Sequence, residues 1–390
     1  MTLGEPTRPL AATLPAGELQ IELHVPAAET DSPLDSLPDP SPAEGLSMAD
    51  RALPFLILGA MLVGVTAGEI VPGLSSALIS FNVSNVSVPV AGLLLWIMYP
   101  VLAGVRYRVL PQAARDPRFM LLSVTLVWLV APAVMFALAW LLLSDLAEFR
   151  TGVILVGLAP CIGMVLVWNL LAGGDSERAT LLVVINSAIQ LIAVPVLAYF
   201  YLNLLPDWLG LSQVRVNVSF WDVAVPVLVF VGIPVLAGAV SHEIGVRRLG
   251  EQGYKERYLD RIGSTTLYGL LALVAMLFAL QGDRITSDPL DVVRIAAPLL
   301  AFFAIMWFLA FGISWAVRFS YQQAATVAFT TAGNNFELAI AIAIGTFGTG
   351  SGEALAGTVG PLIEIPVLVS LVYVSRWAGR TLYRSAMLAG

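Results

Sequence analysis

Residues 322–347 read QQAATVAFTTAGNNFELAIAIAIGTF. The stretch is long enough to cross the hydrocarbon layer of a membrane, which takes about 20 apolar residues in a helix. It is interrupted by Gly333, Asn334 and Asn335, and then carries Glu337, whose ionised carboxylate costs on the order of 3 kcal/mol at the bilayer centre. Acids inside the membrane are functional by default, often in proton relays, although such an acid can also bond to another helix. The stretch therefore predicts a broken membrane helix that carries part of a site.

The rest of the chain has the same apolar character. Hydrophobic residues make up 58% and charged residues 12% of the 390 positions, and the mean hydropathy is +0.85. Soluble proteins carry about 25% charged residues, and their cores could not hide this much apolar surface. We predict an all-α polytopic membrane protein with ten transmembrane helices, at about 52–70, 86–104, 119–143, 152–172, 179–203, 221–241, 262–280, 291–317, 322–347 and 354–377. We expect short polar turns to separate these helices.

The Lys and Arg residues support this number of helices, because they gather in cytoplasmic loops. With the N-terminus inside, sixteen of the 20 basic residues fall on one side, and the exceptions are Arg150, Arg215, Arg284 and Arg294. We therefore expect a multi-pass protein of the cell membrane with both termini in the cytoplasm.

The N-terminal segment differs in composition. Residues 1–48 hold eight of the 24 prolines and many acids, which predicts a disordered acidic tail ahead of a transporter domain at 49–390. Met48 is an alternative start of the chain. Beyond residue 50 the acids and bases nearly balance, at 18 against 19.

Ten helices suggest two inverted repeats of five, at about 51–205 and 221–380, because inverted repeats are common in secondary transporters. The fourth and ninth segments then correspond, and each contains an early break, at Pro160 and at Gly333. A proline frees backbone carbonyls that lipid cannot satisfy. Paired breaks mark a binding site in many transporters, whereas a single break is an ordinary kink.

Two further residues have both a structural and a functional interpretation. Cys161, the only cysteine, is either a small buried hydrophobe or a soft ligand facing an aqueous pathway. Glu364 either exchanges protons with the site or bonds backbone freed by Pro361 and Pro366. Asn169, with Asn186 and Gln190, is typical of hydrogen bonding between helices.

Two acids follow glycine-rich turns, Asp175 after Gly173 and Gly174, and Glu353 after Gly350 and Gly352. Acids favour helix N-termini, so we expect both to cap helices.

Several classes of protein are excluded. The chain has no basic face for nucleic acid, and no Walker A, HExxH or GxSxG motif. With two histidines and one cysteine it offers little for a conventional metal site. We therefore expect neither an enzyme nor a bound cofactor.

The motifs resemble one transporter family. The fourth segment reads GLAPCIGMVLVWN at 157–169, and the ninth reads TAGNNFELAIA at 331–341, followed by SGEAL at 351–355 and GPLIE at 360–364. These runs resemble arsenite efflux permeases of the bile acid/arsenite/riboflavin transporter superfamily, and the likeness extends over about residues 51–380.

The resemblance implies a fold and a site. The fold has discontinuous, crossing helices four and nine, and is divided into a core and a panel domain. The activity is export of arsenite, or of antimonite, in exchange for protons. Cys161 matches the family's essential cysteine and binds arsenic(III) as substrate, and the family's two glutamates match Glu337 and Glu364. We expect Asn334 and Asn335 to bind substrate, Glu337 and Glu364 to couple protons, and four residues to support the site: Pro160, Gly333, Trp168 and Asn169.

Two departures from the family affect substrate detail. Many members have Arg where this chain has Pro160, and Lys where it has Gly104. Two rival functions are a sodium-coupled organic-anion symporter of the same superfamily and a membrane receptor or scaffold that transports nothing.

Overall fold

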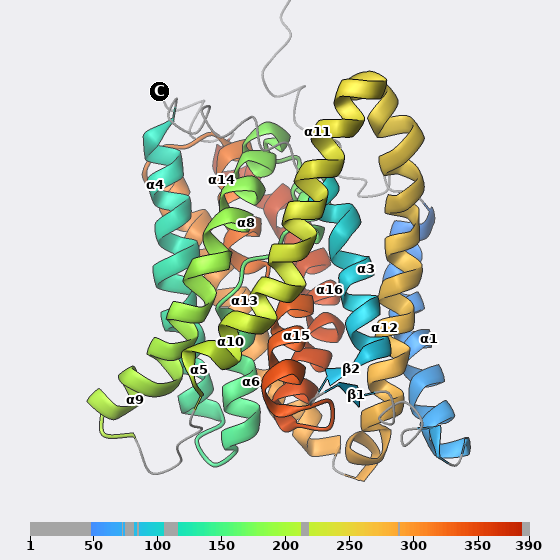
Figure 1. The fold of residues 1–390 in the computed structure, drawn as a ribbon. Helices are drawn as coiled ribbons and strands as arrows, with labels where there is room; N and C mark the ends of the chain where they lie inside the picture. The colour runs from blue at the N-terminus through green and yellow to red at the C-terminus, as the bar shows by residue number, and fades with distance from the viewer. Residues whose placement is uncertain are drawn as a thin grey trace, which may run out of the picture. The chain divides into compact units, whose positions relative to one another are not determined.

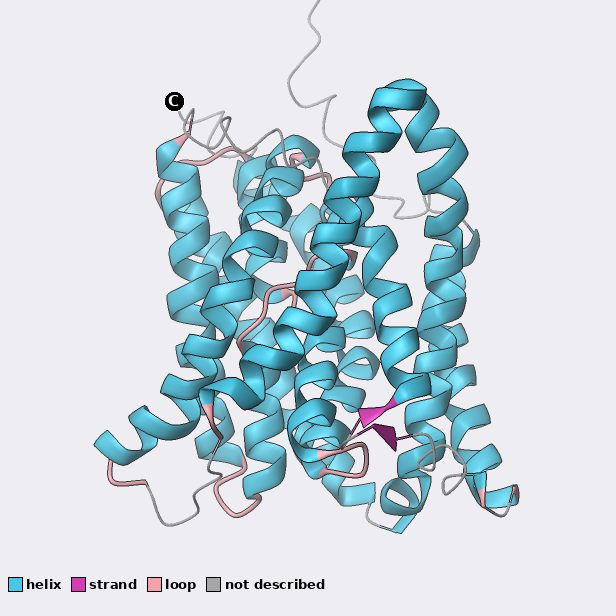
Figure 2. Cartoon of the chain, in the orientation of Figure 1, coloured by secondary structure: helices cyan, strands magenta, loops and turns pink. Residues whose placement is uncertain are grey.

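Helices make up nearly all of the described chain (Figure 1). The computed structural model describes residues 48–71, 73–74, 82–83, 86–104, 116–211, 218–287 and 289–383, which belong to one unit, Asp39–Gly390. Among these residues, the strands are β1 (Asn82–Val83) and β2 (Val86–Ser87), which form one short antiparallel pair (Figure 2). Residues 1–47 of the predicted tail and the basic residues of 105–115 lie outside the described residues, while Met48 begins α1.

Each predicted apolar segment coincides with a helix or with a pair of helices. In the part of the chain that the structure describes, five helical stretches are long and apolar enough to cross a membrane on their own, while other segments are shorter or broken. The helices are α1 (Met48–Ile70), α3 (Val88–Ala103), α4 (Pro117–Thr125) with α5 (Ala131–Leu142), α6 (Ala147–Gly157) with α7 (Met164–Ala172), α8 (Ser176–Tyr199) with α9 (Leu205–Trp208), α10 (Phe220–Val227) with α11 (Ile233–Tyr254), α12 (Asp260–Ser287), α13 (Pro289–Ala316), α14 (Tyr321–Ala332) with α15 (Phe336–Phe347), and α16 (Gly352–Ala378).

Prolines explain why three of these helices contain wider, π-helical turns. The turns η2 (Leu126–Val130), η3 (Phe200–Leu204) and η4 (Leu228–Gly232) are each followed two residues later by Pro132, Pro206 or Pro234. A proline ring clashes with the carbonyl four residues earlier, and that carbonyl lies in the middle of each turn. The wider turn relieves the clash, and the helix continues. Two more π-helical turns are η5 (Lys255–Leu259) and η6 (Gly379–Tyr383).

The link between the sixth and seventh predicted segments is helical, where a polar turn was expected. α11 continues beyond residue 241 to Tyr254, and η5 leads directly into α12. The chain reverses at Gly250, whose φ of 71° and ψ of 168° suit glycine and strain other residues. The resulting hairpin rises beyond the neighbouring helix ends (Figure 1).

The helices α8 and α16 each follow a glycine-rich turn, and their N-termini are capped in different ways. Asp175 caps α8 by accepting a hydrogen bond from the backbone N–H of Arg178, as predicted. The prediction that Glu353 caps α16 was wrong. Ser351 is the cap, because its hydroxyl accepts from the backbone N–H of Ala354, and Glu353 lies in the first turn.

Two of the four basic residues on the minority side have local partners. The buried Arg150 donates to the backbone oxygen of Ser144 at 2.7 Å and lies over the Trp140 ring, 3.8 Å from its centre. Arg294 forms an ion pair with Asp145, and this hydrogen bond lowers the pKa of the Asp145 carboxyl. Both cations therefore stabilise the turn between α5 and α6 or its contact with α13. Arg215 and the side chain of Arg284 lie outside the described residues.

The broken helices lie inside a layer of continuous ones. α1 packs along α12, and α3 packs between α12 and α11. The pair α14 and α15 is covered by α13, α16 and α10, and the pair α6 and α7 packs against α16, α5 and α14. Figure 2 shows loop segments within the helical bundle where the broken helices are interrupted. These interruptions are therefore surrounded by protein, as unpaired backbone at membrane depth requires.

The contact of α1 with α12 depends on glycine at position 64. A Cβ atom built on Gly64 would lie 2.2 Å from the backbone oxygen of Ala275, whereas one built on Gly59 in the same helix meets nothing within 4 Å. We expect Gly64→Val to force the helices apart and to lower the free energy of unfolding by about 1–3 kcal/mol. Thermal denaturation of detergent-purified protein measures the loss. Gly59→Val is the matched control, and equal stability of the two variants would contradict this packing.

Candidate functional site

The two interrupted helices are joined by their backbones. The N–H of Cys161 donates to the carbonyl of Gly333 at 3.0 Å, and the N–H of Asn335 donates to the carbonyl of Ala159 at 2.8 Å. Pro160 and Asn334 face each other between these bonds as an isolated antiparallel bridge. Each broken segment thus satisfies backbone groups of the other, which lipid could not do.

The position of Pro160 within this bridge explains why a proline is tolerated there. In an antiparallel pair, opposed residues alternate between positions that exchange hydrogen bonds and positions that do not. Pro160 occupies a position without exchange, since the bonds are made by its neighbours Ala159 and Cys161. The bridge uses no N–H donor at this position, so a proline there removes none of its hydrogen bonds.

The break also directs helix ends toward the crossing. α7 begins at Met164 and α15 begins at Phe336, each a few residues after the bridge. Asn335 caps α15 by accepting the N–H of Leu338 at 3.0 Å. Backbone N–H groups of Met164 and Val165, in the first turn of α7, interact with the Cys161 thiol. Helix N-termini carry partial positive charge, so this end of each half-helix favours electron-rich groups.

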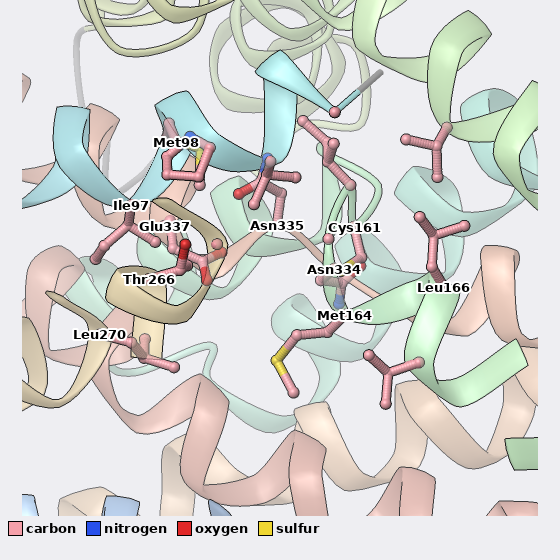
Figure 3. Close-up of a pocket in the computed structure, with 18 of the residues that line it drawn as sticks. Ile97, Met98, Cys161, Met164, Leu166, Thr266, Leu270, Asn334, Asn335 and Glu337 are labelled. Atoms are coloured by element: carbon pink, nitrogen blue, oxygen red, sulfur yellow. The ribbon is translucent and has the colours of Figure 1, made fainter. Parts of the chain in front are cut away.

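A cavity of about 380 Å³ opens beside the bridge. Five of the predicted site residues line it, namely Cys161, Asn334, Asn335, Glu337 and Glu364. In Figure 3, Cys161 and Asn334 lie on one side of the cavity, and Glu337 lies on the side of Thr266 and Ile97. Both carboxyl groups are within electrostatic range of the thiol. The structure therefore brings the sulfur and the carboxylates of separate segments to one cavity.

Several polar atoms at the crossing have no protein partner among the described residues. These are Nδ2 of Asn334, Nδ2 of Asn335 and Oε1 of Glu364, all buried. Oε1 of Glu364 would lie 3.7 Å from a Cβ atom built on Gly333, so the carboxyl reaches the bridge itself. A buried polar group that stays unpaired costs about 1–3 kcal/mol. These atoms therefore suit a small solute that both donates and accepts hydrogen bonds.

The predicted supporting residues lie outside the lining of the cavity. Pro160 and Gly333 form the bridge, while the buried Trp168 and Asn169 lie further along α7. Asn169 accepts a hydrogen bond from the Thr326 hydroxyl at 2.8 Å, which ties α7 to α14. The last turn of α7 is also fixed by other helices, because Tyr321 donates to the carbonyl of Ala172 and Arg376 donates to that of Leu171. These bonds hold α7, and with it the loop that carries Cys161.

Sequence reasoning missed the wall opposite the broken helices. Ile97 and Met98 of α3, with Thr266 and Leu270 of α12, line the same cavity. Met164, three residues after Cys161, adds a third sulfur-bearing side chain to the lining, beside Cys161 and Met98. These residues lie in ordinary apolar segments, so no local pattern distinguishes them, and only the packing of α3 and α12 reveals their place.

Comparison with known proteins identifies the family. The sequence model of the Sodium Bile acid symporter family matches residues 91–288. The arsenical-resistance protein Acr3 of Corynebacterium glutamicum is 49% identical over 338 residues, which is 87% of this chain and 91% of that protein. The chain belongs to the sodium bile acid symporter family and, within it, to the arsenical-resistance type.

Two other relatives agree with this assignment. The arsenical-resistance protein Acr3 of Alkaliphilus metalliredigens is 31% identical over 85% of this chain and 93% of its own length. The uncharacterized transporter slr0944 of a Synechocystis species is 29% identical over 85% of this chain and 89% of its own length. The resemblance based on the fourth and ninth segments is thus confirmed. The chain is a multi-pass membrane transporter and not an enzyme.

Glycine at position 333 is required by the close approach of the two broken segments. Its φ of −77° suits any residue, but a Cβ atom there would lie 3.1 Å from Cβ of Cys161 and 3.3 Å from the backbone oxygen of Phe329. We expect Gly333→Val to displace Cys161 and to lower the free energy of unfolding by about 1–3 kcal/mol. Denaturant titration of the purified protein tests this. Gly312→Val in α13, where a Cβ atom meets nothing within 4 Å, is the control, and an equally small loss in both variants would count against the tight crossing.

Proposed function

We propose that this transporter exports arsenite from the cytoplasm, in exchange for protons, through the cavity at the crossing of the broken helices. One observation carries the proposal: the single thiol of the chain, the buried carboxyl group of Glu364 and the half-buried carboxyl group of Glu337 line that cavity together. The arsenical-resistance relatives support arsenite as the substrate. Antimonite has the same thiophilic chemistry and is the second candidate substrate.

Cys161 gives the cavity its affinity for arsenic. Arsenous acid, As(OH)₃, is neutral at physiological pH, and soft sulfur ligands suit a soft, thiophilic element. The thiol attacks arsenic, one hydroxyl leaves with the thiol proton as water, and the product is a sulfur-bound As(OH)₂ group. A single sulfur keeps this bond reversible, as a carrier requires. The Nδ2 groups of Asn334 and Asn335, which have no partner among the described residues, donate hydrogen bonds to the remaining hydroxyls in this mechanism.

Glu337 and Glu364 supply the proton coupling in this mechanism. Both are in the cavity lining, within electrostatic range of the thiol and of each other. Acids inside membrane segments serve as proton relays in pumps and transporters, so in this mechanism one of the two carboxyl groups takes up the exchanged proton. After releasing the substrate, the carrier takes up that proton from outside. It then returns to face the cytoplasm and releases the proton there.

The membrane arrangement that we propose has ten spans in two inverted repeats, with a core and a panel domain and both termini in the cytoplasm of a cell-membrane protein. The bridge supports the inversion. A local two-fold axis relates residues 159–161 to 333–335, because Pro160 faces Asn334 and the flanking hydrogen bonds are reciprocal. Broken helices that meet at such an axis, near the midplane, are typical of inverted-repeat transporters.

A second candidate function is sodium-coupled uptake of an organic anion. The name of the matching family and the unpartnered oxygen of Glu364 favour it. Transport in vesicles with and without sodium distinguishes the two functions, since the arsenite–proton exchange needs no sodium.

Cys161→Ser tests the substrate site. We expect arsenite resistance conferred on a sensitive host to be lost, because a hydroxyl is a hard ligand and does not replace the soft sulfur. Growth in arsenite measures the loss, and immunodetection in the membrane fraction shows that the variant is present. Full resistance with Ser at this position would refute the role of the thiol.

Glu337→Gln tests the coupling. In everted vesicles, where the proposed outer face points inward, an acidic interior should drive arsenite uptake by the natural protein. We expect the amide, which cannot titrate, to reduce this pH-driven uptake at least tenfold while arsenite still binds to Cys161. Labelled arsenite flux with and without the gradient measures the effect. A variant that still responds fully to the gradient would remove Glu337 from the proton pathway.

A further inference from the structure

A second cavity lies next to the substrate cavity. It has a volume of about 280 Å³ and is formed by the end of α3 and the hairpin of α11, η5 and α12. Polar and charged side chains from the hairpin line most of it, in contrast to the largely apolar substrate cavity. The residues that matter here are Gly104, His242, Glu251, Tyr254, Lys255 and Asp260.

The two cavities follow one another along the same helices. Gly104, at the end of α3, lines both of them. On α12, Asp260 lines the second cavity, and Gly263, Thr266 and Leu270 line the substrate cavity. Their spacing of three or four residues places them on one face of the helix. That face of α12 therefore runs from the charged hairpin to the substrate cavity.

The junction between the cavities is bordered by two glycines. A Cβ atom built on Gly263 would meet nothing within 4 Å. One built on Gly104 would meet two backbone oxygens of its own helix, the nearer that of Val101 at 3.4 Å, which is ordinary contact. No described side chain therefore fills the space directly beside either backbone. Larger residues at these positions would project into that space.

Hydroxyl groups hold the helices around this junction in place. Tyr99 of α3 shares hydrogen bonds with Ser241 of α11 at 2.7 Å and with Tyr258 of η5 at 2.5 Å. Tyr254 donates to the backbone oxygen of Ala103, immediately before Gly104. The opening between α3 and the hairpin is thus fixed by cross-links between three elements.

We infer that the second cavity is the cytoplasmic vestibule of the transporter, and that Gly104 and Gly263 form the passage from it to the substrate site. The hairpin carries Arg247, Arg248, Lys255, Arg257 and Arg261, and such basic segments face the cytoplasm. The vestibule suits a small, neutral, hydroxyl-bearing solute, because its polar lining keeps a hydrated path and the glycine passage admits only compact molecules. The identity of that solute rests on the proposed arsenite export, whereas the passage itself does not.

Cys161 allows the passage to be tested without any transport substrate. It is the only cysteine, so a membrane-impermeant, cationic methanethiosulfonate reagent reports access to the substrate cavity alone. We expect the reagent to label Cys161 in everted vesicles, where the cytoplasmic face is outside. Gly104→Trp and Gly263→Trp should each slow this labelling at least tenfold. Two independent positions keep the test informative if one variant is not inserted, and labelling in denaturing detergent shows that the thiol is intact.

Matched controls come from glycines away from the passage. Gly92→Trp in α3 and Gly312→Trp in α13 add the same side chain at positions that line neither cavity. A Cβ atom built on either glycine meets nothing within 4 Å. We expect labelling at the natural rate in both controls. Natural rates in the Gly104 and Gly263 variants, or no labelling of the natural protein from the cytoplasmic face, would overturn the vestibule.

Arsenite flux into the same vesicles separates this inference from the proposed function. If the natural protein transports arsenite and the two passage variants do so equally fast, the vestibule is refuted and arsenite export stands. If labelling slows as expected but the natural protein moves no arsenite, the passage stands and the proposed substrate fails.

Discussion

The structure depends on a reciprocal pair of backbone hydrogen bonds in the middle of the protein. Residues 159–161 and 333–335 leave their helices and satisfy each other, from Cys161 to Gly333 and from Asn335 to Ala159. Lipid offers no hydrogen bonds, so neither break is stable without the other. The positions of Cys161, Asn334 and Asn335, which we propose bind substrate, follow from this constraint, because the bridge fixes where each half-helix restarts.

The bridge also sets the electrostatics of the cavity. The half-helices α7 and α15 both start at the crossing. The first N–H groups of α7 therefore lie beside the Cys161 thiol, and the first turn of α15 carries Glu337. Glu364 arrives from α16, which packs against α15 and α6. The interaction network at the end of α7, through Asn169, Tyr321 and Arg376, keeps one side of this arrangement in place. A carrier needs such a rigid site while other elements move around it.

Opposite the bridge, continuous helices supply the other wall. α3 and α12 bring apolar residues, one methionine, one threonine, and the glycines at the junction of the two cavities, of which Gly104 lines both and Gly263 the substrate cavity. In the proposed mechanism Cys161 and Glu337 lie on the broken helices and Glu364 on α16, while the inferred access route lies along α3 and α12. Tight glycine contacts, such as that of Gly64 with α12, fix the position of this wall.

The sequence by itself determined the apolar segments, the two breaks and the family, since each rests on local composition or on a short motif. It also singled out Cys161 and Glu337, because a lone thiol beside a proline and an acid within an apolar run are conspicuous locally. Tertiary structure decided the rest. Ile97, Met98 and Thr266 carry no local signal. The connection between α11 and α12 is helical on both sides of the reversal at Gly250, where a short polar turn was expected, and Ser351 rather than Glu353 caps α16. Which side chains share a cavity depends on helix packing and on hydrogen bonds between residues far apart in the chain, and no single segment encodes these.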